Sequence, residues 1–187
     1  MTRAAAVFGF AGWSGSGKTT LIEQLIPRLV DAGRIVSLIK HAHHEFDIDR
    51  PGKDSYRHRQ AGCTEVLVSS ALRWALMHEL RGEPELDLGA ALQRLAPCDL
   101  VLVEGYKSAA IPKLEVHRPS VGKSLLYLDD PQIVALATDR GTVESGVLGR
   151  NLSLPVFALE DTDKIATFIL SHVGSGRQRI DAETRRA

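Results

Sequence analysis

The chain has 187 residues, of which 44% are hydrophobic and 25% charged, and its 23 basic and 23 acidic side chains balance to a formal net charge of zero. This size and composition are typical of one globular domain, and the balanced charge argues against a protein that coats nucleic acid. No apolar run approaches the roughly 20 residues of a membrane-spanning helix. The two cysteines, Cys63 and Cys98, fit no metal-binding spacing and are expected to be reduced thiols. We therefore expect a cytoplasmic protein that binds neither nucleic acid nor membrane.

The first 40 residues have the pattern of a parallel-sheet unit. Residues 4–12 form an apolar run that ends in glycines, which predicts a strand buried on both faces. Apolar residues at helical spacing after Lys18 predict a helix that ends at Gly33, with a bend at Pro27. Residues 34–40 predict a second buried strand. A strand, a helix and a strand in this order make a βαβ unit.

The stretch GWSGSGKTT joins the first strand to the first helix and has the Gly-x-x-x-x-Gly-Lys-Thr spacing of a P-loop. In such a loop, successive N–H groups turn toward phosphate oxygens, and the helix N-terminus adds a favourable dipole. Lys18 is expected to reach the β- and γ-phosphates, Thr19 to complete the coordination of a magnesium ion, and Thr20 to contact the α-phosphate. The predicted nucleotide-binding residues here are Gly12, Ser14, Gly15, Ser16, Gly17, Lys18, Thr19 and Thr20.

The loop after the second strand, KHAHHEFDIDRPGK, is polar and rich in histidine. His41, His43 and His44 could bind zinc or another transition metal. Neutral histidines could equally donate hydrogen bonds to phosphate, and a solvated charged loop is the third interpretation. An acid in this loop could reach the magnesium through water, and Asp49 is preferred to Asp47 for that role.

The middle of the chain predicts smaller elements. A short helix is expected from about residue 54 to 61. The apolar segments 64–70 and 73–80 follow each other too closely for a crossover helix, so we expect an antiparallel pair at an edge of the sheet. A helix is expected over 85–96.

Further strands and a last helix complete the pattern. The expected strands are 99–107, 112–118, 132–139 and 154–159, and the expected helix runs from about 161 to 174. These elements predict an α/β, three-layer P-loop NTPase fold with a mostly parallel sheet and an antiparallel edge. We expect one P-loop domain over residues 1–173 and a disordered polar tail over 174–187.

Acids at strand ends are the remaining site candidates. Glu104 ends an apolar strand, where ligands of parallel sheets gather, and could hold magnesium; the alternative is an acid in a solvated turn. Lys18, Glu104 and Asp49 are thus the candidate catalytic residues, and Thr19, Glu104 and Asp49 the candidate metal ligands. Asp139 ends another strand and could accept hydrogen bonds from N1 and N2 of guanine, which adenine cannot offer. The full Asn-Lys-x-Asp signature is absent, and helix capping by Asp139 is the alternative.

Three segments together resemble the MobB family, the molybdopterin-guanine dinucleotide biosynthesis adaptor proteins. They are GWSGSGKTTLIEQLIPRL, KHAHHEFDIDRPGKDSYRHRQAG and DLVLVEGYKSAAIPKLEVHR. The resemblance spans about residues 5–172, and the middle segment is more specific than the P-loop alone.

The resemblance implies a GTP-binding P-loop protein related to metallochaperone GTPases, usually a homodimer, with weak GTP hydrolysis. It implies an adaptor that assists the MobA-type molybdopterin-guanylyltransferase, which joins GMP to molybdopterin in making the molybdenum cofactor. By motif, Gly12–Thr20 would bind the phosphates, Glu104 and Asp49 would lie near magnesium, and residues 43–56 would face the γ-phosphate or the pterin. We also expect Lys107, Lys113 and Arg118 to line a groove for the phosphate of molybdopterin.

Two other functions stay open at this point. A P-loop small-molecule kinase would need an arginine-rich lid over the phosphates, and no such helical segment is evident in the sequence. A metal-delivery GTPase would use the histidines at positions 41, 43 and 44 as metal ligands.

Overall fold

The computed structural model describes residues 5–42, 46–145 and 152–175. The chain forms two compact units, Met1–His41 with Leu88–Ala187, which we call the sheet unit, and Ala42–Asp87, the hairpin unit. The single domain expected over residues 1–173 therefore contains a second compact group of residues. The expected tail begins inside the last helix, and its part from residue 176 onward lies outside the described residues.

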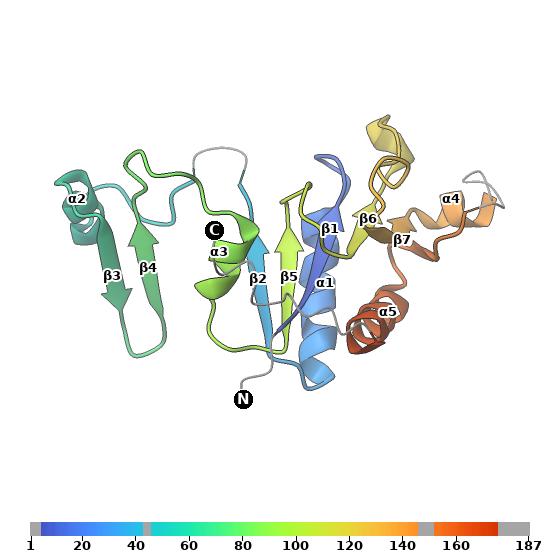
Figure 1. Cartoon of the computed structure of the whole chain (residues 1–187), viewed down its shortest axis with the longest axis horizontal. Helices are drawn as coiled ribbons and strands as arrows, with labels where there is room; N and C mark the ends of the chain where they lie inside the picture. The colour runs from blue at the N-terminus through green and yellow to red at the C-terminus, as the bar shows by residue number, and fades with distance from the viewer. Residues whose placement is uncertain (1–4, 43–45, 146–151, 176–187) are drawn as a thin grey trace. The chain divides into compact units, whose positions relative to one another are not determined.

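Six strands make up the sheet unit, in the order β2-β5-β1-β6-β7-β8 (Figure 1). Every pairing between neighbouring strands is parallel. Each strand lies within a segment expected to form one. The segment of β6 alternates polar and apolar residues, whereas the other segments are the apolar runs typical of a parallel sheet. The strands are β1 (Ala6–Ala11), β2 (Val36–Lys40), β5 (Leu100–Glu104), β6 (Lys113–Val116), β7 (Ile133–Thr138) and β8 (Val156–Ala158).

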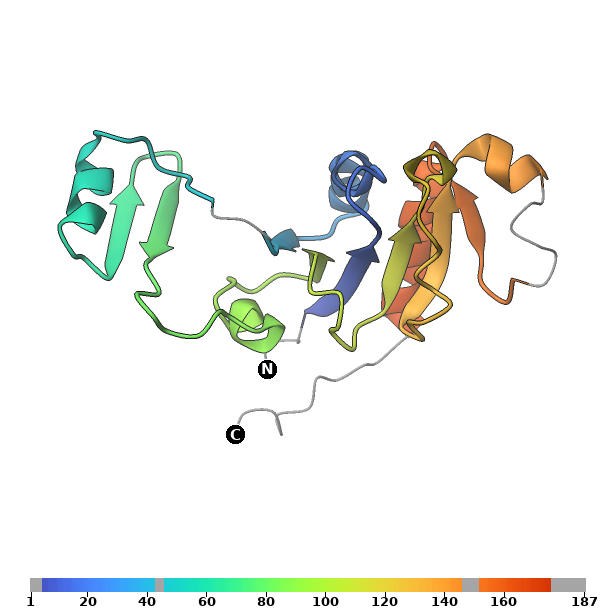
Figure 2. The same ribbon diagram turned by 90° about the horizontal axis from the view of Figure 1, so that it is seen from above.

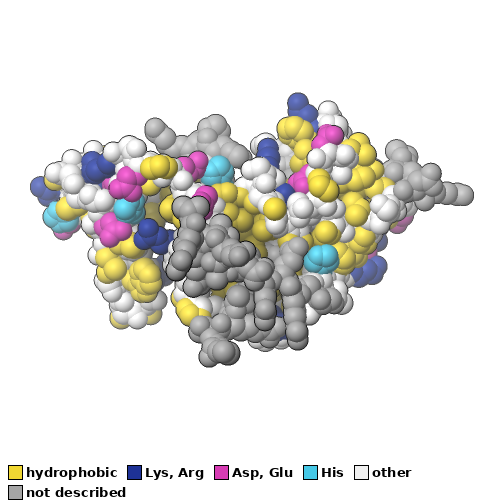
Figure 3. All heavy atoms as spheres, viewed as in Figure 1, with side chains coloured by type: hydrophobic (Ala, Val, Ile, Leu, Met, Phe, Trp, Pro, Cys, Tyr) yellow, Lys and Arg dark blue, Asp and Glu magenta, His cyan; other side chains and the backbone are white. Residues whose placement is uncertain are grey.

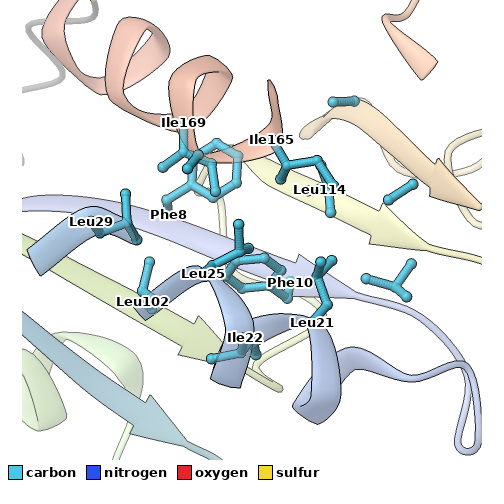
Figure 4. Packing of buried hydrophobic residues seen from close by; sticks show 14 of the residues in the cluster. Phe8, Phe10, Leu21, Ile22, Leu25, Leu29, Leu102, Leu114, Ile165 and Ile169 are labelled. Carbon is cyan, nitrogen blue, oxygen red and sulfur yellow. The ribbon is translucent and has the colours of Figure 1, made fainter. Parts of the chain in front are cut away.

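Two long helices, α1 (Lys18–Asp31) and α5 (Thr162–Ser175), cover one face of this sheet. Their apolar residues recur one turn apart, which places them on a single helix face. That face packs on two phenylalanines of β1 (Figure 4). The residues at the centre of the cluster, all at most 3% exposed, are Phe8, Phe10, Leu21, Leu25, Leu29, Ile165 and Ile169.

The opposite face is covered by a shorter helix, α3 (Leu88–Gln93), which lies across the sheet from α1 (Figure 2). Leu88 and Leu92 of this helix pack against Val101 and Val103 of β5. The helix expected over 85–96 is thus present but shorter. Helices on both faces of a parallel sheet confirm the predicted three-layer α/β fold.

The hairpin unit contains α2 (Asp54–Gln60), β3 (Glu65–Ser69) and β4 (Trp74–His78). The two strands pair antiparallel, as predicted. They form a two-stranded sheet of their own, however, and not an edge of the six-stranded sheet, so that part of the prediction is wrong. The spacing of two strands predicts their pairing with each other, but it carries no information about which sheet the pair joins.

The P-loop strand lies in the interior of the sheet, with β5 on one side and β6 on the other. The chain first adds β2 and β5 on one side of β1 and then crosses to β6 on the other side. Ligands of such sheets bind at the carboxyl ends of the strands where the order reverses. Two short elements were not expected from the sequence: a 3₁₀ turn, Pro119–Val121, and α4 (Arg140–Ser145). In the described part of the chain, no helix is long and apolar enough to cross a bilayer.

Candidate functional site

The P-loop between β1 and α1 has a backbone that requires glycine at both ends. Gly12 has a φ of 147°, and a Cβ added there would lie 2.4 Å from Val116 O on the neighbouring strand. Gly17 is the N-cap of α1 with a φ of 95°, and no side chain caps the helix. The first N–H groups of α1 are therefore available to an anion, which the helix dipole also favours.

Lys18 holds its ammonium group against the loop itself. Its Nζ donates hydrogen bonds to Gly12 O at 2.8 Å and to Trp13 O at 2.9 Å. Burial lowers the pKa of Lys18 below its usual value, and neighbouring lysines lower it further, whereas Glu104 raises it. The loop that would bind the phosphates thus already holds the lysine predicted to contact them.

The other P-loop residues differ in exposure. Ser14, Gly15 and Thr20 are exposed. Ser16 is 1% exposed, and its Oγ has no hydrogen-bond partner among the described residues. A buried hydroxyl without a partner is uncommon in folded proteins, and a bound ligand or water would satisfy it.

Thr19 and Glu104, two of the predicted magnesium ligands, are in direct contact. Thr19 Oγ1 donates to Glu104 Oε1 at 2.9 Å. The parallel register explains this, because Glu104 at the end of β5 pairs with Phe10 of β1, shortly before the P-loop. On its other side Lys40 Nζ lies 3.4 Å from Glu104 Oε2. Glu104 is only 8% exposed, which excludes the interpretation as an acid in a solvated turn.

Asp139 follows β7, and an arginine connects it to the P-loop. Arg118 Nη1 donates to Asp139 Oδ1 at 2.7 Å, and Arg118 Nε donates to Ser16 O at 3.1 Å. The main-chain oxygen of Asp139 accepts from Thr142 N at 2.9 Å. Within the described part of the chain, the carboxylate binds Arg118, and only the main-chain oxygen bonds to α4 (Arg140–Ser145).

Asp49 lies in the hairpin unit, and both of its carboxylate oxygens are engaged. Oδ1 accepts from Ser55 Oγ at 2.9 Å and from the next main-chain N–H at 2.9 Å, and Oδ2 accepts from Arg59 Nε at 3.3 Å. Burial raises the pKa of Asp49, but these hydrogen bonds lower it more, so the pKa is below its usual value. Asp47, the other candidate, accepts from Arg59 Nη2. The structure does not bring Asp49 into the unit that contains the P-loop, and its magnesium role stays a prediction.

His41 follows β2 and packs against the end of β5. Its main-chain N donates to Glu104 O at 2.8 Å, and its ring centroid lies 4.8 Å from that of Tyr106. His43 and His44 lie outside the described residues. Over residues 5–42, 46–145 and 152–175, no three His, Cys, Asp or Glu side chains are grouped to hold a metal ion. The histidine metal site therefore stays a prediction.

Sequence reasoning missed a row of buried polar residues on β6 and at the residue that follows it. Lys113, Glu115 and His117 alternate along the chain, so they share one face, and each is at most 8% exposed. Glu115 accepts hydrogen bonds from Leu126 N at 2.7 Å and Tyr127 N at 2.9 Å, and burial raises its pKa despite them. Alternating polar and apolar residues are typical of a strand that has one face in water, so these side chains would be expected to be exposed. Their burial could have been predicted from the parallel sheet, because a central strand of such a sheet is covered on both faces.

The Lys113 ammonium group is fully engaged inside the protein. Its Nζ donates to Lys107 O at 2.8 Å and Ala109 O at 2.9 Å, and lies 2.8 Å from Asp130 Oδ2. Its stem crosses Gly9, where a Cβ would lie 2.7 Å from Lys113 Cγ. Lys113 therefore cannot line a ligand groove as expected, because its buried ammonium anchors the segment after Glu104.

Trp13 of the P-loop contacts two neighbouring segments. Its Nε1 donates to Ser124 O at 2.8 Å. Lys107 Nζ and Lys123 Nζ lie 5.3 and 5.7 Å from the centre of its ring. These distances are within the range of cation–π attraction. The segments after β5 and β6 thus meet on one P-loop side chain.

Comparison with known proteins assigns the family. A sequence model described as "Molybdopterin guanine dinucleotide synthesis protein B", MobB, matches residues 7–139, which is more than half of the chain. The chain belongs to the MobB family. The resemblance found in the sequence is thereby confirmed. The matched range contains the whole P-loop and Glu104, and it ends at Asp139.

Individual MobB relatives agree with this assignment. A protein of Escherichia coli K12 named "Molybdopterin-guanine dinucleotide biosynthesis adapter protein" is 40% identical over 167 residues, 88% of this chain and 91% of the relative. A relative of the same name from Haemophilus influenzae is 42% identical over 139 residues, 74% of this chain and 78% of the relative. A crystal structure of "molybdopterin-guanine biosynthesis protein B (mobB)" is 26% identical with a TM-score of 0.66, and the match covers 89% of this chain and 99% of that chain.

Proposed function

We propose that this chain binds GTP with magnesium and acts as an adaptor in the biosynthesis of molybdopterin guanine dinucleotide, in the cytoplasm. The names of the E. coli and H. influenzae relatives support the adaptor role. The observation that carries the nucleotide part is the 2.9 Å contact of Thr19 with Glu104 beside an intact P-loop. A hydroxyl and a carboxylate next to the amides of a helix N-terminus are the groups with which P-loop proteins hold magnesium and phosphates.

Magnesium fits this donor set because both groups offer oxygen, the ligand atom that magnesium prefers. Thr19 Oγ1 and Glu104 would hold the ion, directly or through water, and the ion would neutralise charge on the phosphates. Lys18 would exchange the carbonyl oxygens of the loop for phosphate oxygens. Asp49 would join as a ligand through water, with Ser55, Arg59 and the Arg50 main chain already holding three of its about four lone-pair sites.

Guanine is the base that Asp139 would select. Its carboxylate would accept hydrogen bonds from the N1 and N2 donors, which adenine does not offer. The link from Asp139 through Arg118 to the P-loop supports placing the base beside the phosphates.

Hydrolysis of the bound GTP is proposed to be weak. Phosphoryl transfer needs a positioned water molecule and added positive charge on the γ-phosphate. Arg118 lies beside the loop, but Asp139 and Ser16 O hold its guanidinium group. The missing charge would have to come from a partner, such as a MobA-type guanylyltransferase carrying molybdopterin, or from a second copy of this chain.

A homodimer is proposed because the hairpin unit exposes apolar side chains. Leu67, Trp74 and Leu76 are 61%, 67% and 43% exposed, and Figure 3 shows hydrophobic side chains gathered over β3 and β4. A two-stranded sheet is marginally stable alone, and a contiguous exposed apolar surface marks an interaction site. Light scattering should give the mass of a dimer for the parent protein and of a monomer for Trp74→Lys. A monomeric parent protein would exclude this part of the proposal.

Calorimetry with GTP and ATP, with and without magnesium, tests the nucleotide site. The parent protein should bind GTP in a magnesium-dependent way, and Lys18→Ala should lose that binding. Lys164→Ala removes an exposed lysine of α5 and is the matched control. Absence of magnesium-dependent binding of any purine triphosphate, or its survival in Lys18→Ala, would contradict the proposal.

The adaptor role needs a separate assay. The formation of molybdopterin guanine dinucleotide by a guanylyltransferase should increase when this chain is added with GTP. Lys18→Ala should not produce the increase. An equal increase with both proteins would show that nucleotide binding has no part in the adaptor function.

A further inference from the structure

Arg118 connects two parts of the site that are distant in the sequence. It follows β6, the strand between β1 and β7 in the sheet. Its Nε donates to Ser16 O at 3.1 Å and its Nη1 to Asp139 Oδ1 at 2.7 Å. The guanidinium group also lies against Gly17, where a Cβ would stand 3.3 Å from Arg118 Nε. One planar group thus fixes the Asp139 carboxylate relative to the P-loop backbone.

The contact leaves the Asp139 carboxylate able to accept further hydrogen bonds. Arg118 donates to Oδ1, and no described residue donates to Oδ2. An ionised carboxylate has about four lone-pair sites, and the Asp139 side chain is 35% exposed. A ligand can therefore donate hydrogen bonds to Asp139 while Arg118 stays in place.

We propose that Arg118 is a positioning residue for base recognition. It holds Asp139 at a fixed place beside the P-loop, so that a base whose phosphates lie in the loop can present its N–H donors to the carboxylate. The inference rests on the proposed binding of GTP and names a residue that makes the binding specific for guanine. Lysine cannot replace this arginine, because a single ammonium group lacks the planar fork that spans two acceptors in fixed directions.

The competing explanation is an ion pair that only stabilises the fold. The Arg118 and Asp139 side chains are 39% and 35% exposed, and ion pairs this exposed contribute little to stability. A purely structural arginine would also change the affinities for GTP and ATP together. A positioning arginine changes their ratio.

The test is the affinity of Arg118→Met and Arg118→Lys for GTP and ATP, with magnesium present. Both variants should bind GTP about ten-fold or more weakly, which is the change in affinity that the loss of one hydrogen bond to a charged group usually causes. Both should bind ATP as the parent protein does. Asp139→Ala should show the same loss, and adding Arg118→Met to it should cause little further loss, because the two residues act as a unit. The matched control is Arg140→Met, whose guanidinium group pairs with Asp161 at 2.7 Å.

Each outcome decides between explanations. Equal losses of GTP and ATP affinity in Arg118→Met would assign the arginine to the phosphates and overturn the inference. Unchanged affinities for both nucleotides would reduce it to a surface ion pair and also overturn it. If the parent protein binds no purine triphosphate, or Lys18→Ala binds as well as the parent protein, the proposed function fails and the inference fails with it. A Lys18-dependent site with an unchanged ratio in Arg118→Met rejects the inference alone.

Discussion

Replacing Lys113 by methionine should destabilise the sheet unit, because three acceptors would lose the donor that they share. In the parent protein Nζ lies 2.8 Å from Lys107 O, 2.9 Å from Ala109 O and 2.8 Å from Asp130 Oδ2. Methionine has a similar unbranched stem, so it fills the space above Gly9. The substitution therefore removes the charge and its hydrogen bonds with little change in volume.

The size of the effect follows from the burial of the two charges. Removing one partner of a buried ion pair costs about 3–5 kcal/mol, because the other charge stays behind without compensation. The Lys113 side chain is 2% exposed, whereas that of Asp130 is 25% exposed. Water can therefore solvate part of the remaining carboxylate, which favours the lower end, about 3 kcal/mol. For a chain of this size such a loss lowers the melting temperature by about 6–12 °C.

Urea unfolding followed by circular dichroism measures this loss. Lys107→Met is the matched control, because Lys107 is exposed and its ammonium lies 5.3 Å from the Trp13 ring. An exposed cation–π contact contributes only about 0.5–1 kcal/mol. Equal stability of Lys113→Met and the parent protein would refute the reasoning, and so would equal losses in the two variants.

Three further predictions concern the P-loop and the hairpin unit. Gly12→Ala should abolish GTP binding without unfolding the protein, because its Cβ would collide with a neighbouring carbonyl oxygen; binding and circular dichroism measure the two effects. GTP should change the fluorescence of Trp13, because the Lys18 ammonium would leave the Trp13 carbonyl oxygen to bind phosphate. The measurement uses the Trp74→Phe variant, in which Trp13 is the remaining tryptophan. The Glu65 carboxylate raises the pKa of His78. The folded hairpin therefore binds the imidazolium proton of His78 more tightly than the unfolded chain does, and it loses this stabilisation as pH rises through the raised pKa. Hydrogen-exchange protection factors in β3 and β4, which are corrected for the intrinsic pH dependence of exchange, should fall as pH rises through that raised pKa in the parent protein and change less in Glu65→Gln.

The sequence predicts the sheet well because β1, β5 and β7 are short apolar runs that end at or beside a glycine or an acid. β1, α1 and β2 lie within the predicted segments. Elements without such a pattern were missed: α4 has six residues, too few to show helical periodicity. The separate hairpin sheet was missed for another reason, since spacing along the chain does not determine which strands meet across it.

Some residues of the candidate site could likewise be predicted from the sequence, and others could not. Glu104 could be predicted because one residue combines an acidic side chain with a strand end, and the register then places it on Thr19. Arg118 was expected to serve a phosphate groove, whereas its actual contacts depend on the order of strands in the sheet. The burial of Lys113 depends on contacts with Lys107, Ala109 and Asp130, which lie in loops and show no pattern in the sequence. Asp49 was chosen by its place after β2, and the sequence gives no sign that Arg59 engages its carboxylate.

The stretch from Glu104 to Lys113 is held at both of its ends. Glu104, at one end, accepts a hydrogen bond from Thr19 and would share a bound cation with it, while the Lys113 ammonium at the other end ties the chain to the sheet. If phosphates bind in the P-loop, the residues between these two ends that are free to respond are the exposed ones, Lys107, Ser108 and Ala110. They would give the proposed adaptor a small surface beside the P-loop whose shape could depend on the bound nucleotide.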